Sequence, residues 1–271
     1  MNRPTARPKV TAQQVKIANR QFFDAVADHY EKIDGRRSSK LETWLRKNLF
    51  TLRQRAAGGR LLDIGTGSGL VTRCAEGLFT SRVGVDLSPK ILSTSQSAFD
   101  FAIAADVEAL PFADGSFDVV TCFAVLHHLY AFEGLVSEVA RVLNAGGIFY
   151  SDHDMDATFA RRYHWLLRCY RKLCNARAKY RHASHEISRE LYELTEWQEE
   201  GVNASTLTGL FERAGLSVEI SFHWFGLTSF TDRLVGGKTT PRGYAPLISL
   251  LARRSGSQRE ENGKPQKAQK A

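Results

Sequence analysis

Three glycines on alternate positions are the residues of this sequence best placed to bind a ligand. Gly65, Gly67 and Gly69 follow the apolar run from Leu61 to Ile64. Glycine lets a backbone turn sharply and lets a ligand approach it closely. A helix beginning near Leu70 would point its N-terminal amide groups at that ligand. The pattern therefore predicts a buried strand, a tight ligand-binding turn and a helix, although a glycine-rich turn without a ligand would look the same.

Two aspartates follow the next predicted strands and suggest what the ligand contains. Asp86 ends the second strand, where its carboxylate can accept hydrogen bonds from both hydroxyls of a ribose. Asp106 follows the third strand and can accept a hydrogen bond from the amino group of an adenine, while the Val107 amide can donate one to a ring nitrogen. The spacing predicts a nucleoside, with a capping or loop role for either aspartate as the alternative.

These residues need a framework in which strands and helices alternate. Strands are predicted over Arg60–Ile64, Arg82–Asp86, Phe101–Ala105, Phe117–Phe123, Ile148–Ser151, Ser217–Phe222 and His223–Phe230. Helices are predicted over Leu70–Gly77, from Ser88, and over Phe132–Leu143, Ala204–Ala214 and Ala245–Ala252, after two N-terminal helices within Thr11–Asn48. The alternation predicts an α/β fold, doubly wound and Rossmann-like, with a mostly parallel seven-stranded sheet and ligands at the carboxyl ends of its strands.

Domain organisation follows from where the alternation stops. We expect a flexible basic arm over residues 1–10 and a single domain over residues 11–252. A disordered basic tail is expected over residues 253–271. Within the domain, residues of about 155–195 predict a helical lid inserted between two strands. The basic stretch Phe159–Arg181 belongs to this lid and contains no acidic residue. It could face an acidic, phosphorylated or lipid-like substrate, contact RNA, or simply be a solvated helix.

Composition narrows the setting of the protein. The four cysteines, Cys74, Cys122, Cys169 and Cys174, have no metal-site spacing, and we expect free buried thiols in a reducing compartment. No apolar run approaches the roughly 18–20 residues of a membrane span, and no signal-peptide core is present. We therefore expect a cytoplasmic protein. Its net charge of +8 lies largely in the two ends.

Together these motifs resemble those of class I S-adenosylmethionine-dependent methyltransferases, and most closely the ubiquinone/menaquinone-type small-molecule branch. The resemblance covers about Leu61 to Ser151, with the motifs in order and at normal spacing. It is carried by Asp63–Gly69, Gly84–Ser88, Ala105–Phe112, Ser116–Val120, Ala124–Leu129 and Arg141–Gly147. In the last of these, Asn144-Ala145 replaces a familiar proline.

The resemblance implies roles for individual residues toward S-adenosylmethionine. Gly65 and Gly67 would let the backbone approach the methionine part, with Asp63 near its amino group. Asp86 would hold the ribose. The remaining implied positions are Leu87 packing on adenine, Asp106 and Val107 reading its edge, and Phe123 with Ala124 beside the transferable methyl group.

A base would be needed if the methyl acceptor is a hydroxyl or an ammonium group. His127 and His128 follow the fourth strand, and His153 follows the fifth, so we treat these three as candidates. Each could instead cap a helix or pack against the sheet. Consecutive residues such as Asp152 to Asp156 seldom converge on one ion, so no metal site is predicted.

The sequence therefore predicts transfer of a methyl group to a small-molecule acceptor by in-line displacement. A nicotinamide-dependent dehydrogenase is disfavoured because its fingerprint is G-x-G-x-x-G, whereas Gly65, Gly67 and Gly69 alternate. RNA methylation is the first alternative, although no RNA-binding module and no Asn/Asp-Pro-Pro-aromatic motif is apparent. A cofactor-binding protein without transfer activity, serving in regulation or assembly, is the second.

Overall fold

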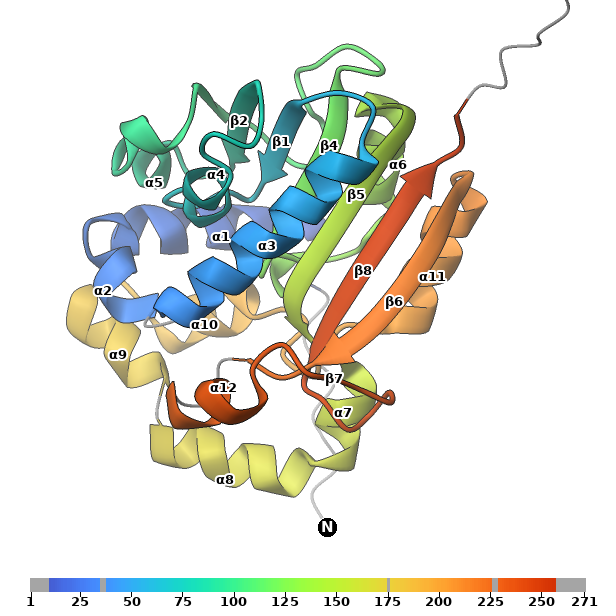
Figure 1. The fold of residues 1–271 in the computed structure, drawn as a ribbon. Coiled ribbons are helices and arrows are strands. Elements are labelled where there is room, and N and C mark those ends of the chain that lie inside the picture. Colours follow the sequence, from blue (N-terminus) through green and yellow to red (C-terminus); the bar gives the residue numbers. More distant parts are fainter. Residues whose placement is uncertain (1–9, 35–37, 175, 226–228, 257–271) are drawn as a thin grey trace, which may run out of the picture.

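An eight-stranded sheet forms the centre of the computed structural model, which describes residues 10–34, 38–174, 176–225 and 229–256 (Figure 1). The strand order is β3-β2-β1-β4-β5-β8-β6-β7. The strands are β1 Arg60–Ile64, β2 Ser81–Asp86, β3 Phe101–Ala104, β4 Phe117–Phe123, β5 Leu143–Met155, β6 Leu216–His223, β7 Thr239–Thr240 and β8 Leu247–Arg254. The first five pair in parallel, whereas β8 is antiparallel to both β5 and β6.

The central strands of the sheet are buried on both faces, which explains why their sequences are nearly continuous apolar runs. In β4, every residue from Phe117 to Cys122 is buried. Helices cover both faces of a parallel sheet, so its inner strands cannot alternate between apolar and polar side chains. The predicted bounds of β1 and β4 are confirmed.

Two predictions in the C-terminal part are wrong. Residues 245–252, expected to be helical, lie largely in β8, which is inserted between β5 and β6. Leucine and alanine favour helices only weakly, and pairing with strands on both sides outweighs that preference. The strand expected over residues 223–230 is also wrong: β6 ends at His223 and helix α12 occupies Ser229–Val235. The sheet has eight strands because β7, only two residues long, pairs with the end of β6.

Helices cover the two faces of the sheet. Helix α3 (Ser39–Arg55) crosses the front in Figure 1, and the short α4 (Leu70–Cys74) packs with it on that face. Helices α6 (Glu133–Val142) and α11 (Ala204–Arg213) pack behind, around Phe149 and Phe211. Beside β2 and β3 lies α5 (Pro89–Ser93), which begins as predicted with Ser88 as its cap.

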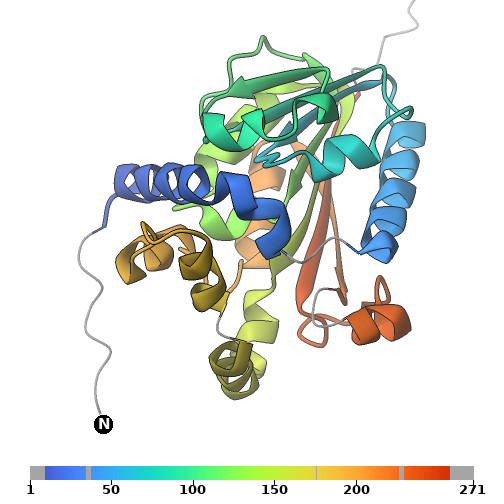
Figure 2. The same ribbon diagram turned by 90° about the vertical axis from the view of Figure 1, so that its left-hand side faces the viewer.

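Helix α1 (Ala12–Val26) lies across the carboxyl ends of the parallel strands, as Figures 1 and 2 show. A capping box between Thr11 and Gln14 fixes its start. The shorter η1 (Ala27–His29) and α2 (Tyr30–Asp34) continue from it. On the side away from the sheet, Phe22 and Val26 pack against the inserted segment.

The inserted segment between β5 and β6 is helical, but it is not one long helix. It comprises α7 (Ala157–Arg162), α8 (His164–Cys174), α9 (Ala176–Ala183) and α10 (Arg189–Thr195). Asp156 caps α7 through the backbone N–H of Phe159, and the chain leaves helical geometry at Tyr163. The remaining short helices are η2 (Gln96–Ala98) and η3 (Leu126–His128).

Other composition-based predictions have mixed outcomes. Cys74 and Cys122 are free and buried as expected, whereas Cys169 is free but exposed, and the side chain of Cys174 lies outside the described residues. The predicted tail begins too early, because Arg253 and Arg254 belong to β8. The arm through residue 9 and the tail from residue 257 lie outside the described residues. Among the helices that are described, none has both the length and the apolar character needed to cross a membrane.

Candidate functional site

A cavity opens at the carboxyl ends of β1, β2 and β4 and is closed on one side by α1. All eight residues predicted to bind the cofactor line it, and of the three candidate histidines only His128 does. The lining residues are Val15, Lys16, Asn19, Phe23, Tyr30, Asp63, Gly65, Thr66, Gly67, Ser68, Leu70, Val71, Asp86, Leu87, Asp106, Val107, Glu108, Phe123, Ala124, Val125, His128, Leu129 and Tyr130. Tertiary folding thus brings the motifs from four separate loops onto one cavity.

The positions of Gly65 and Gly67 in the turn differ in what a side chain there would contact. All three have left-handed φ angles, 66° at Gly65, 55° at Gly67 and 81° at Gly69. A Cβ atom at Gly65 would lie 2.4 Å from Cγ2 of Val125, so this position is closed by packing. A Cβ atom at Gly67 would meet nothing closer than Cε1 of Tyr30 at 3.7 Å. Gly67 therefore leaves open cavity space that a side chain would fill.

Asp63 is a buried carboxylate held by two hydroxyl groups. Thr66 Oγ1 donates to its Oδ2 at 2.6 Å and Thr121 Oγ1 donates to its Oδ1 at 2.7 Å. Only 1% of the residue is exposed. Burial, together with the charge of Asp86, raises the pKa of Asp63 to about 7 despite these hydrogen bonds.

Asp86 shapes the same wall of the cavity. Its Oδ2 accepts a hydrogen bond from the backbone N–H of Gly67 and its Oδ1 from that of Ser88, both at 2.9 Å. Burial raises the pKa of Asp86 as well. In the described part of the chain, neither Asp63 nor Asp86 has an ion pair with a cationic side chain. The cavity therefore contains two buried carboxylates that lack a cationic partner among the described residues.

Asp106 is bound differently from Asp86. Its Oδ1 accepts the backbone N–H of Glu108 at 2.9 Å, and Lys16 Nζ lies 2.7 Å from its Oδ2 and 2.6 Å from Glu108 Oε2. Burial opposes the charge on Lys16, but the hydrogen bonds to both carboxylates raise its pKa. Helix α1 is thereby tied to the loop predicted to bind adenine, and Lys16 is a site residue that the sequence did not reveal.

His128 is the candidate base that faces the cavity. Its Nδ1 lies 2.8 Å from the carbonyl oxygen of Thr195, which can only accept, so Nδ1 carries the hydrogen and Nε2 holds the lone pair of the neutral ring. Burial and the neighbouring charge of His127 lower the pKa of His128 to about 4. The ring is therefore neutral at neutral pH, with its lone pair on Nε2.

His127 lies beside this ring but does not line the cavity. The two imidazole centroids are 3.9 Å apart. Asp154 Oδ1 accepts the backbone N–H of His127 at 3.0 Å and lies 2.7 Å from its Nδ1. Asp154 is a buried partner that the sequence analysis did not select, although its position in β5 beside His153 could have suggested it.

His153 lies behind the wall of the cavity, so this candidate base does not line it. Its ring stacks on Phe123 with centroids 4.2 Å apart, and Phe123 faces the cavity instead. Nδ1 of His153 and Nε2 of His223 lie 2.7 and 2.8 Å from the same atom, Oδ1 of Asp152. Tyr150 donates its hydroxyl to Oδ2 of that carboxylate at 2.6 Å.

The charge state of this buried cluster differs from that of Asp63. Burial alone would raise the pKa of Asp152, but the charges and hydrogen bonds of His223 and His153 outweigh burial and hold its pKa well below the usual range. Asp152, His153 and His223 also have a spacing that could hold a metal ion, as do His127, His128 and Glu196. Because Oδ1 of Asp152 already accepts from both histidines, we interpret the first group as a hydrogen-bond cluster, and the predicted lack of a metal stays a prediction.

Residues of α1 are the main part of the site that sequence reasoning missed. Asn19 lies in the apolar stripe of this helix, and its Nδ2 donates to the backbone oxygens of Val15 and His128 at 2.9 and 3.0 Å. A lone amide between apolar positions is the signal that could have identified the helix face covering the cavity.

Comparison with known proteins shows what these motifs are similar to. Residues 62–151 match the family described as a methyltransferase domain. A ubiquinone biosynthesis O-methyltransferase from Burkholderia vietnamiensis is 36% identical over 103 residues, which are 35% of this chain and 44% of the relative. A ubiquinone/menaquinone biosynthesis C-methyltransferase from Geotalea uraniireducens is 33% identical over 151 residues, or 51% of this chain and 63% of the relative. The matches thus span less than two thirds of either relative.

Solved structures extend the likeness in fold beyond the matched domain. An S-adenosylmethionine-dependent methyltransferase from Thermotoga maritima superimposes with a TM-score of 0.57 at 16% identity. The superposition covers 87% of this chain and 99% of the other. At this identity, the likeness concerns the fold.

Proposed function

We propose that this chain, whose residues 62–151 form a class I S-adenosylmethionine-dependent methyltransferase domain, transfers a methyl group to a small-molecule acceptor. The observation that carries the proposal is the pair of buried carboxylates, Asp63 and Asp86, beside an open glycine turn and without a cationic partner among the described residues. Burying a carboxylate is costly unless a positive charge compensates for it. A ligand that carries both a cationic group and a ribose would supply partners for the two carboxylates on this side of the cavity.

The residues of the cavity fit such a cofactor one by one. Asp63 would pair with an ammonium group, Asp86 would accept the two ribose hydroxyls, and the space beside Gly67 would take the ligand backbone. Leu87 and Val107 supply apolar surface for a planar base, with Asp106 at its edge. When bound, S-adenosylmethionine supplies the methyl group to be transferred.

The acceptor end of the cavity is lined by Phe123, His128, Leu129 and Tyr130. We assign His128 as the group that removes a proton from a hydroxyl or ammonium acceptor, because its lone pair is on Nε2 and it alone of the three candidates lines the cavity. Asn19 and Thr195 hold its backbone and ring in place through hydrogen bonds. The apolar and aromatic surroundings favour an acceptor with a large apolar part, such as a lipid-like compound carrying a polar group.

The relatives support a small-molecule acceptor only by likeness, because each is matched over part of its length. RNA methylation is the second candidate function, favoured by the cations of the inserted segment. Cofactor binding without methyl transfer is the third. A cytoplasmic location stays a prediction from cysteine usage.

One experiment tests the proposal. Purified protein with radiolabelled S-adenosylmethionine is offered small-molecule, lipid and RNA fractions of a cell extract, and label is expected in the small-molecule or lipid fraction. His128→Ala should lower transfer on the order of 100-fold because a positioned base contributes that much, with cofactor affinity unchanged. His164→Ala, on the exposed surface of α8, is the matched control. Label appearing only in RNA, or full activity in His128→Ala, would contradict the corresponding assignment.

A further inference from the structure

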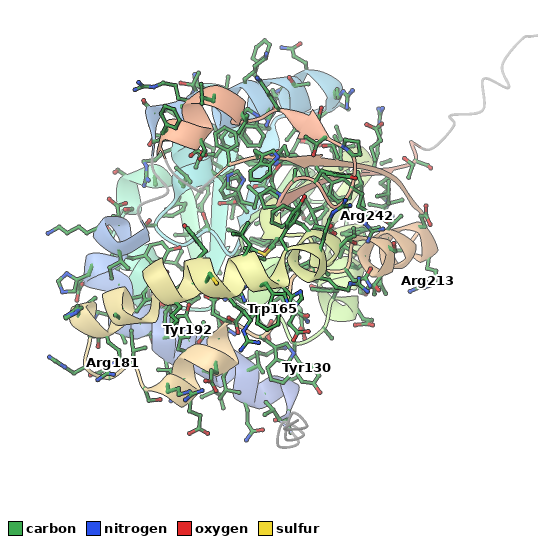
Figure 3. All side chains as sticks on the ribbon, turned by 90° about the horizontal axis from the view of Figure 1, so that it is seen from below. Tyr130, Trp165, Arg181, Tyr192, Arg213 and Arg242 are labelled. Carbon is green, nitrogen blue, oxygen red and sulfur yellow. The ribbon has the colours of Figure 1, made fainter. Side chains whose placement is uncertain are left out.

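The lower face of the molecule exposes large apolar side chains on two helices of the C-terminal half. On α8, Trp165 and Leu166 are 68% and 67% exposed. On α12, Phe230 and Leu234 are 70% and 56% exposed. Both helices lie on this face in Figure 1, and Figure 3, seen from below, looks onto it with α8 crossing the view and Trp165 labelled on it. We call these four residues the apolar patch.

Packing within the chain does not account for the apolar patch. In the described part of α8, Leu167 is the residue that is buried, and the helix turns Trp165 and Leu166 outward. Phe230 and Leu234 are four residues apart in α12 and therefore lie on one face of that helix. Single exposed apolar residues need no explanation, but two pairs of large ones, on two helices that both lie at the lower end of the molecule in Figure 1, indicate an interaction surface.

The charges between these side chains indicate what kind of surface is bound. Residues 157–174, which form α7 and α8, contain five arginines or lysines and no aspartate or glutamate. Arg161, Arg168 and Lys172 are exposed, and the guanidinium of Arg168 lies 5.5 Å from the centroid of the Trp165 ring. Exposed apolar residues interleaved with cations are typical of helices that lie in the interface of an anionic bilayer, where the long cationic side chains reach the phosphates.

We propose that this face docks on an anionic lipid bilayer. The apolar patch enters the headgroup region, and Arg161, Arg168 and Lys172 meet the lipid phosphates. A nucleic acid would use the cations but has no use for exposed Leu166 and Leu234, so the leucines favour lipid. A tryptophan beside cations is also the residue type that membrane interfaces favour.

Docking would place the cavity on the lipid side of the molecule. The parallel strands run toward the lower face in Figure 1, so their carboxyl ends, where the cavity opens, lie nearer to the bilayer than their amino ends do. An apolar acceptor dissolved in the bilayer would then have a short path to the cavity. The docking itself does not depend on methyl transfer or on cofactor binding.

Vesicle sedimentation with the full chain tests this inference. Protein should sediment with vesicles of phosphatidylcholine containing about 30% phosphatidylglycerol, and much less with phosphatidylcholine alone. Raising the ionic strength from about 0.05 to about 0.5 M should weaken the binding without abolishing it, because salt screens the charges but not the apolar contact. Trp165→Ser combined with Leu166→Ser should lower the partition coefficient by about tenfold or more.

Phe101→Ser provides the matched control, because Phe101 is 66% exposed on β3, at the amino end of the sheet. It should sediment like the parent protein. Calorimetry with S-adenosylmethionine separates this test from that of the proposed function, since the double variant should bind the cofactor normally. Equal sedimentation of the double variant and the parent would overturn the inference, as would binding of RNA with no binding of anionic vesicles, or formation of a dimer that the double variant cannot form.

Discussion

Asp63 and Asp152 are both buried aspartates, each near the carboxyl end of its own strand, yet their surroundings are opposite. At the end of β1, the partners of Asp63 among the described residues are two neutral hydroxyl groups, and its pKa is raised to about 7. In β5, Asp152 accepts from two histidines and a tyrosine, and its pKa is lowered. Among the described residues, the charge of Asp152 is compensated and that of Asp63 is not.

This difference separates a buried carboxylate that has no cationic partner among the described residues from one that two histidines and a tyrosine contact. The first region, around Asp63 and Asp86, faces a cavity and lacks a cation from the described residues. The second, around Asp152, is buried, and the rings of His153 and His223 pack against the half-buried Trp44. We therefore expect substitutions in the first region to change ligand binding and those in the second to change stability.

The largest effect is expected from Asp152→Asn. The substitution removes the negative charge that accepts hydrogen bonds from His153 and His223. Because it breaks a buried charge interaction, it should lower the free energy of unfolding by about 3 kcal/mol. Urea unfolding measures it. Asp114→Asn is the control, because Asp114 is 81% exposed and pairs with Arg141 on the surface; its cost should stay below about 1 kcal/mol. Equal costs for both variants would show that the buried cluster contributes no special stability.

The pH dependence of that stability follows from the sign of the shift. A carboxyl group whose folded pKa is depressed stabilises the fold above the unfolded pKa, near 4, and this contribution is lost as the pH falls through the folded pKa. The parent protein should therefore keep the contribution of Asp152 at neutral pH and lose it only in acid. A stability difference between parent and Asp152→Asn that vanishes already near pH 6 would contradict the assignment.

The next effect concerns ligand affinity. Asp86→Ala should weaken S-adenosylmethionine binding on the order of 100-fold, since it removes charge-assisted hydrogen bonds to two hydroxyls. Asp100→Ala is the control, because Asp100 pairs with Arg82 at the other end of β2, away from the cavity. Calorimetry gives both constants. Unchanged affinity in Asp86→Ala would contradict the assignment of Asp86 to the ribose. It would also contradict the expectation that substitutions around Asp63 and Asp86 change ligand binding.

The smallest effect is a linked proton. Because the folded pKa of Asp63 is raised to about 7, its charged form is disfavoured, and the fold loses stability as the pH rises from about 4 to about 7. A cationic ligand reverses this cost, so binding should release a proton near pH 7, and the affinity should weaken by up to about tenfold for each pH unit that the pH falls below 7. Calorimetry in buffers of different ionisation enthalpy detects the proton. Asp63→Asn should bind without proton release; release that persists would assign the proton to another group.

The sequence predicted the structure correctly where a pattern of a few neighbouring residues is enough to fix the local backbone conformation. The glycine turn, β4 and the cap at Ser88 were predicted correctly because strand burial, left-handed glycine and capping each act over a few residues. The same reasoning failed at Ala245–Ala252, where neighbouring strands override helix-favouring residues. It also could not tell His128 from His127 and His153 as the histidine that lines the cavity, because a position after a strand does not say which way the side chain points.

By itself, the sequence determined the α/β class, the cofactor-binding motifs and the set of residues that line one wall of the cavity. Only the tertiary structure decided which histidine faces that cavity, that α1 closes it through Lys16 and Asn19, and that Asp152 is satisfied by His223, 71 positions away. The physical reason is that backbone demands are local, whereas the compensation of a buried charge depends on side chains brought together from distant parts of the chain.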